Sequence, residues 1–258
     1  PIFVMNNKNL QTNLKLSKLK LTKDSIENSG DISAKGKNQL FPERLSKEHV
    51  GTLPIVKFGG RIHIIKERKD LSQAIKTLSC ETVLGFDTET RPNFKKGVQN
   101  PVSLLQLSTP NDAYLFRLNL LGFPYELVSL LTDKNILKVG VAILDDIRAL
   151  QKLCKFDAES FVELSDIGSQ LGIITCGLQN LAAIFFGVRI TKKERLTNWD
   201  KTEFNQSQCL YAATDAWICL EMFSFLESKN LLPEKIIWKM PDIKSSKRKN
   251  IFKKYKKD

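Results

Sequence analysis

The stretch TVLGFDTET, at residues 82–90, places two acidic side chains directly after an apolar run. Residues 82–86 have the length and composition of a buried β-strand. Asp87 and Glu89 then lie at or just past the strand end and, two residues apart, point to the same side. Charges beside a buried strand are costly unless they are paired or bind metal, and Arg91 is the one nearby salt-bridge candidate. The triplet indicates a cation site, although a turn or surface pair would give the same triplet.

The pattern around this stretch predicts an α/β fold with a mixed sheet flanked by helices. Strands expected at residues 102–108 and 113–118 indicate an antiparallel meander. Further along, helices are expected at 125–131, 145–153 and 178–186, alternating with strands at 137–142 and 161–164. That alternation is typical of parallel strands joined by crossover helices.

The outer elements follow from the same patterns. Order is expected to begin near Leu53, with a strand at 62–65 and a helix at 71–78. The last long helix is expected at about 206–227, where Asn205 and Gln208 have the spacing of a capping box.

Two further acidic positions stand out. Asp145 and Asp146 follow an apolar strand and begin a helix, where either carboxylate would also serve as a routine cap. Tyr211 and Asp215 are four residues apart, so they share one helix face and can point into one site. A buried tyrosine hydrogen-bonded to an aspartate is the simpler interpretation of that pair taken alone.

Composition limits the remaining possibilities. The five cysteines lack a C-x-x-C pair and are expected to be buried, reduced thiols. His49 and His63 are too isolated for a zinc site or a catalytic triad, so neither is assigned a role. No stretch approaches the roughly 18 uninterrupted apolar residues of a membrane helix, and the N-terminus lacks a signal pattern. We expect a soluble intracellular protein, cytoplasmic or, in a eukaryote, nuclear, with no membrane partner.

The net charge of +12 is concentrated at the two ends of the chain. Residues 1–24 carry +4 and residues 241–258 carry +6, which leaves +2 for the part between them. A near-neutral body with basic ends fits an acidic site with accessory nucleic-acid contacts, and it equally fits solubilising disordered tails. The expected organisation is a flexible basic segment at 1–47, one catalytic domain at 48–232 and a basic tail at 233–258.

Several ordered blocks together resemble the DEDD exonucleases, in particular the tyrosine-bearing branch with ribonuclease D and the Werner exonuclease domain. The blocks are LGFDTET (84–90), PVSLLQL (101–107), KVGV (138–141) leading to Asp146, GLQNLA (177–182), NW (198–199) and YAATDA (211–216). The resemblance covers roughly residues 52–230. The histidine-bearing branch would place its histidine five residues before the last aspartate, where this chain has Leu210.

The resemblance implies a ribonuclease H-like fold and a metal-dependent 3′→5′ exonuclease. It carries over the following residues: Asp87 and Glu89 as first-motif acids, Asp146 as the second, and Tyr211 with Asp215 as the third. Two divalent cations, Mg²⁺ or Mn²⁺, are implied, with Asp87 bridging them, Glu89 and Asp215 completing the nucleophile-side metal, and Asp146 supporting the other metal through water. Tyr211 would position the attacking water. Asp146 is preferred because the family acid precedes the run at 147–150, and Asp145 remains the alternative.

The resemblance also has departures. Ribonuclease D relatives commonly carry helical domains after the nuclease, and too few residues follow Leu232 for one. After the NW block, residues 200–204 replace the usual basic-Pro-Leu run, which leaves RNA and DNA both open as substrates. The expected partner is nucleic acid with a single-stranded 3′ end. The alternatives are a catalytically silent nucleic-acid-binding module and a phosphatase acting on small molecules.

Overall fold

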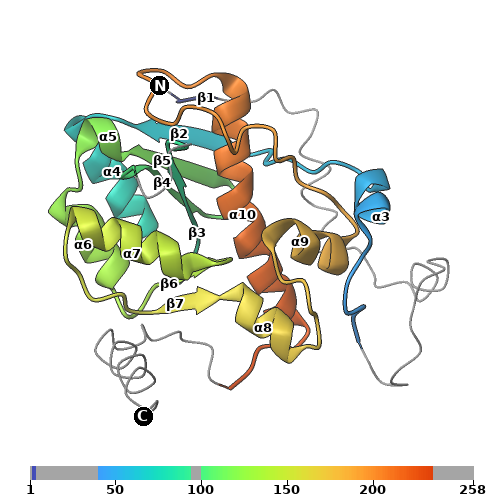
Figure 1. Ribbon diagram of the computed structural model, residues 1–258. Coiled ribbons are helices and arrows are strands. Elements are labelled where there is room, and N and C mark those ends of the chain that lie inside the picture. Colours follow the sequence, from blue (N-terminus) through green and yellow to red (C-terminus); the bar gives the residue numbers. More distant parts are fainter. Residues whose placement is uncertain (1, 4–39, 94–99, 235–258) are drawn as a thin grey trace, which may run out of the picture.

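The computed structural model describes residues 2–3, 40–93 and 100–234, which build a seven-stranded sheet with helices on both faces (Figure 1). In spatial order the strands are β1 (Ile2–Phe3), β2 (Arg61–Ile65), β5 (Asp112–Arg117), β4 (Val102–Ser108), β3 (Val83–Thr90), β6 (Leu137–Gly140) and β7 (Phe161–Glu163). β3, β4 and β5 form the expected antiparallel meander, and β6 and β7 continue the sheet in parallel with β3. The predicted α/β class with a mixed sheet is confirmed.

The helices divide between the two faces of the sheet. They are α3 (Lys47–Thr52), α4 (Arg68–Leu78), α5 (Leu118–Leu121), α6 (Tyr125–Thr132), α7 (Ile143–Leu153), α8 (Leu164–Gln170), α9 (Leu178–Phe186) and α10 (Gln206–Ser228). Apolar residues of α4, α6 and α7 form one core with one face of the sheet, and those of α8, α9 and α10 form a second core with the other face. The sequence pattern did not indicate α3, α5 or α8, because helices of four to seven residues are too short to show a helical period.

The central helix α10 is apolar on all sides because the protein surrounds it. Its length and composition would suit a membrane span, but 89% of its apolar window is buried inside the protein. The predicted capping box is present: the Asn205 side chain accepts from the Gln208 amide at 2.7 Å, and the Gln208 side chain accepts from the Asn205 amide at 3.3 Å. α10 crosses the sheet over β3 and β4 (Figure 1).

The ends of the expected organisation fall mostly outside the described residues. Of the segment 1–47, only residues 2–3 and 40–47 are described, and the tail beyond Glu234 is not. Packing begins before Leu53, where order was expected to start. Phe41 is 2% exposed and meets the ring of Phe185 edge-on at 5.1 Å, and α3 begins behind the Ser46 cap.

His63 packs within the fold, and the cysteines form no disulfide. His63 Nε2 lies 2.6 Å from Asp112 Oδ1, and its ring stacks on Tyr114 at 4.6 Å. All five cysteines are free, as expected. The prediction that they are buried is confirmed for Cys209 and Cys219, but Cys154 and Cys176 are only half-buried, and Cys80, just after α4, is exposed.

Candidate functional site

The first-motif acids lie within β3 and not beyond its end. The apolar run stops at Phe86, but β3 continues to Thr90 because its backbone stays paired with β4, with Asp87 opposite Gln106 and Glu89 opposite Leu104. The pairing of β3 with β6 ends at Gly85. The acidic half of β3 therefore has a strand on one side only, and Asp87 and Glu89 point together toward α10, as their spacing predicts.

Gly85 determines how closely α10 approaches this strand. A Cβ built on Gly85 would lie 2.0 Å from the Ala216 carbonyl oxygen and 2.4 Å from Ser108 Oγ. Only glycine allows the helix backbone to come this near. Because Asp215 directly precedes Ala216, this contact brings the Asp215 carboxylate down to the strand.

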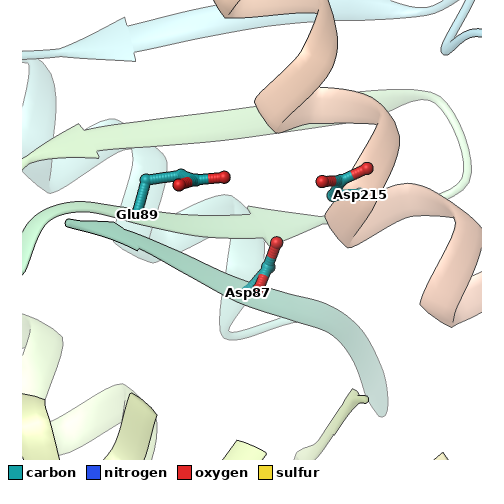
Figure 2. Close-up of side chains that lie close together, drawn as sticks. All are labelled: Asp87, Glu89 and Asp215. Carbon is teal, nitrogen blue, oxygen red and sulfur yellow. The ribbon is translucent and has the colours of Figure 1, made fainter. Parts of the chain in front are cut away.

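Three carboxylates meet as a result. Oxygens of Asp87, Glu89 and Asp215 all lie within 4.8 Å of one another, and Figure 2 shows the two strand residues pointing toward Asp215 on α10. Glu89 is 8% and Asp215 4% exposed. Among the described residues, no lysine or arginine forms a salt bridge with any of the three.

Burial and mutual repulsion change the acidity of this cluster. Burial, followed by the charges of Asp146, Asp215 and Glu89, raises the pKa of Asp87 well above its usual value. Burial and the charges of Asp215 and Asp146 raise the pKa of Glu89 to about 9, against the attraction of Arg195. Burial raises the pKa of Asp215 to about 7, although its hydrogen bond with Tyr211 lowers it. Ionising all three carboxylates therefore costs free energy, through burial and mutual repulsion, and a bound cation would offset this cost.

Tyr211 lies one turn before Asp215 on α10, as the four-residue spacing predicts. Burial and the nearby carboxylates raise the pKa of its phenol, so the hydroxyl stays protonated and can donate a hydrogen bond. The Trp199 ring, which is fully buried, packs beside Tyr211 at 6.0 Å and against Phe204 at 5.2 Å. The tyrosine is thus fixed at the edge of the carboxylate cluster.

The two aspartates of α7 point in different directions. Asp145 is exposed and lies 3.4 Å from Arg148. Asp146 points toward β3, where Thr88 Oγ1 donates to Asp146 Oδ1 at 2.5 Å. Burial raises the pKa of Asp146 to about 7, although the Thr88 hydrogen bond lowers it. This geometry favours Asp146 over Asp145, but Asp146 does not belong to the group of three within 4.8 Å.

Glu163, which the sequence did not indicate, holds the start of α7. Ala142 precedes the helix with φ of 60° and offers no side-chain cap. Instead the carboxylate of Glu163, at the end of β7, accepts from the amides of Ala142 at 2.9 Å and Ile143 at 2.8 Å. It also accepts from the Ser165 amide at 3.0 Å. A carboxylate at a helix N-terminus accepts hydrogen bonds from free backbone amides and interacts favourably with the positive end of the helix dipole.

The loop between α9 and α10 runs beside the site and is held by side chains of β4 and β5. The guanidinium of Arg117, at the end of β5, donates to the carbonyl oxygens of Lys201 and Thr202 and lies 3.7 Å from the centre of the Phe204 ring. Asp200 accepts from Ser103 at 2.6 Å. The segment 200–204, where the expected basic-Pro-Leu run is missing, is therefore held by protein contacts.

The residues of the cluster suit a divalent cation. Their donors are all carboxylate oxygens, which hard divalent cations such as Mg²⁺ and Mn²⁺ prefer. One oxygen of Asp215 is buried and has no hydrogen-bond partner among the described residues, which is unusual for a carboxylate without a bound ion. The donor set and this unpaired oxygen both fit a metal centre.

Comparison with known proteins gives the same picture. A family model described as 3′-5′ exonuclease matches residues 62–230. The mouse bifunctional 3′-5′ exonuclease/ATP-dependent helicase WRN is 35% identical over 184 residues, covering 67% of this chain and 13% of the mouse protein. A 3′-5′ exonuclease of Arabidopsis thaliana is 28% identical over 212 residues, covering 76% of this chain and 73% of that protein. The chain thus corresponds to a small part of the first relative and to most of the second.

Solved structures with low sequence identity share the fold. The EXO domain of Nibbler from Aedes aegypti superposes with a TM-score of 0.60 at 21% identity, covering 72% of this chain and 90% of that one. Ribonuclease D from Escherichia coli gives a TM-score of 0.59 at 20% identity, covering 67% of this chain and 47% of that one. These likenesses confirm the expected ribonuclease H-like fold.

Proposed function

Because this chain belongs to the 3′-5′ exonuclease family, whose members act on nucleic acid, we propose that it hydrolyses phosphodiester bonds from a 3′ end and releases nucleoside 5′-monophosphates. The observation that carries the proposal is the group of three carboxylates on β3 and α10 whose oxygens lie within 4.8 Å of one another. Such a group is costly without a cation, and a phosphodiester needs its negative charge neutralised before water can attack it.

Each proposed site residue has a separate task. Asp87, Glu89 and Asp215 would hold one divalent cation, Mg²⁺ or Mn²⁺, and Asp87 with Asp146 would hold a second. When bound, the cations neutralise charge on the phosphate and make the attacking water easier to deprotonate. The Tyr211 hydroxyl, which keeps its proton, orients that water by a hydrogen bond.

We also propose a single-stranded 3′ end as the preferred substrate, with RNA favoured over DNA for testing first. A relative in structure, ribonuclease D of Trypanosoma brucei, has been solved in complex with the RNA U12. The WRN relative is named both as an exonuclease and as a helicase, so a DNA substrate is the alternative outcome. Basic residues at both ends of the chain would add phosphate contacts that do not depend on sequence.

The experiment uses 5′-labelled single- and double-stranded RNA and DNA oligomers with Mg²⁺ or Mn²⁺. We expect ladders that shorten from the 3′ end and nucleoside 5′-monophosphates as products. Asp87→Ala should abolish hydrolysis while the protein stays folded, because the change removes a carboxylate that would hold both cations and relieves repulsion. Asp146→Asn should also be inactive, whereas Asp145→Asn serves as the control because its side chain is exposed.

The outcomes separate the candidate functions. Binding of oligomers without any product would favour a catalytically silent nucleic-acid-binding module. Hydrolysis of small phosphomonoesters but not of oligomers would favour a phosphatase. An Asp87→Ala protein with activity within about tenfold of the wild type would refute the metal site, since loss of a metal bridge should cost several kcal/mol of transition-state stabilisation.

A further inference from the structure

Asp146 is the one proposed metal-site acid that approaches from the other side of the sheet. Side chains of a strand alternate between faces, so Asp87 and Glu89 point toward α10 while Thr88 points toward the face that α7 covers. Asp146 extends from the first turn of α7 on that second face. Neither α10 nor the side of β3 that carries the other acids can hold it in place.

The backbone of Asp146 is fixed by a tight packing of α7 on β3. A Cβ built on Gly140, at the end of β6, would lie 2.5 Å from Ile143 Cγ2 and 2.8 Å from the Phe86 carbonyl oxygen. The chain therefore turns closely against β3 before the helix begins, and Glu163 holds that turn through the amides of Ala142 and Ile143.

The side chain needs a further contact, because a fixed backbone leaves an aspartate free to turn about two torsions. Thr88 Oγ1 provides it with the 2.5 Å hydrogen bond to Asp146 Oδ1. Threonine is suited to this task, since its branched Cβ restricts rotation and aims the hydroxyl. A hydroxyl donates one proton only, so the remaining acceptor positions of the carboxylate stay available to a cation or a water.

We propose that Thr88 is a positioning residue that orients the Asp146 carboxylate for the second cation. This inference rests on the proposed function. Thr88, the middle residue of the triplet, would thereby link Asp87 and Glu89 on one face of β3 with Asp146 on the other face. Thr88 does not touch the substrate and acts through Asp146.

The test is Thr88→Val, which keeps the shape of the side chain and removes the hydroxyl. Mn²⁺ binding to the full chain is measured by titration calorimetry without substrate. Loss of a residue that orients a metal ligand typically weakens metal binding by about 10- to 100-fold, which is the result expected here. Thr88→Ser keeps the hydroxyl and should restore most of the affinity. Thr90→Val is the matched control, because Thr90 lies on the same strand and, within the described ranges, its hydroxyl donates to no carboxylate.

A double-mutant cycle tests whether Asp146 is the residue through which Thr88 acts. If Thr88 acts through Asp146, Thr88→Val should have no further effect on Mn²⁺ binding in an Asp146→Asn protein. Unchanged Mn²⁺ binding in Thr88→Val, or a loss that persists in the Asp146→Asn background, would overturn the proposal. Thr88→Ala, which also lacks the hydroxyl, carries the test if the valine variant does not fold.

The metal-binding measurement keeps this inference separate from the proposed function. A wild-type protein that binds Mn²⁺ but releases no mononucleotide would refute the exonuclease activity and still allow the Thr88 test. Conversely, a protein that degrades oligomers and whose Thr88→Val variant binds Mn²⁺ normally would refute the role of Thr88 alone. Thermal midpoints of all variants should be compared, since the proposed role predicts an effect on metal binding that exceeds any effect on folding.

Discussion

Replacing Gly85 by alanine should separate the carboxylates without removing any of them. The new Cβ would lie 2.0 Å from the Ala216 carbonyl oxygen, whereas ordinary contact begins at 3.4 Å. The helix must therefore move away by more than 1 Å, or β3 must bend by as much. Asp215 is the neighbour of Ala216, so its carboxylate moves away from Asp87 and Glu89.

The expected loss follows from that displacement. A misplacement of about 1 Å in a catalytic group can cost about 100-fold in rate, which we expect for Gly85→Ala in single-turnover release of mononucleotide. Overpacking a tight core contact also costs about 1–3 kcal/mol of folding stability. The assay is therefore run well below the thermal midpoint of the variant, and Mn²⁺ affinity is measured beside it.

Gly51→Ala is the matched control. Nothing lies within 4 Å of a Cβ built on Gly51, which sits in α3 far along the chain from the site. Alanine in a helix is more stable than glycine by about 1 kcal/mol, so this variant should keep its rate and gain slightly in stability. A Gly85→Ala protein that turns over within about threefold of the wild type would refute the argument that close helix approach assembles the site.

Three other predictions test the remaining groups. Tyr211→Phe should slow turnover substantially but keep metal and oligomer binding, because only the water-orienting hydroxyl is removed. Weakened substrate binding at an unchanged turnover rate would instead make Tyr211 a binding or packing residue. The metal-free protein should lose the contribution of Glu89 to stability as pH rises from about 4.5 to about 9, because the raised pKa means that the folded state keeps a proton which the unfolded chain releases. Thermal midpoints with chelator should fall across that range, and Mg²⁺ should offset the fall. A Glu89→Gln protein should show a smaller fall and not lose it entirely, because the pKa values of Asp146 and Asp215 are raised as well. Residues 241–258 carry +6, so their deletion should make the affinity for single strands depend less on salt. The slope of log affinity against log salt should fall by about 0.7 for each phosphate that the tail neutralises, while the saturated single-turnover rate stays unchanged. An unchanged slope would assign the tail no role in binding.

The elements that the sequence predicted are those whose apolar pattern matches their own burial. The strand at 102–108 has the predicted bounds, and all of its residues are buried. The helix at 178–186 also has the predicted bounds, and its residues from Leu181 to Phe186 are all buried. β3 was predicted too short, since its acidic half is held by backbone pairing with β4, which leaves no apolar signal at Asp87 and Glu89.

The candidate site was predicted through the ordered blocks and not through any one motif. Within a helix, the spacing of Tyr211 and Asp215 fixes a shared face, and within a strand the spacing of Asp87 and Glu89 does the same. Their meeting depends on α10 packing over β3, which local patterns do not contain. The choice between Asp145 and Asp146 likewise depends on which side of α7 faces β3, and there the buried Ile143, Ile147 and Leu150 determine the orientation of the helix.

The supporting residues were not predictable because their partners lie far away along the chain. Thr88 and Asp146 are 58 residues apart, and Glu163 lies 21 residues from the Ala142 amide that it accepts from. In the sequence, Thr88 looks like a spacer that sets Asp87 and Glu89 on one face. The same alternation that unites those two acids must send the middle side chain to the opposite face, and α7 arrives on that face with Asp146 in its first turn. A spacing of two in the first motif therefore orients three side chains, two toward the cluster directly and one toward the acid that joins it from the other side.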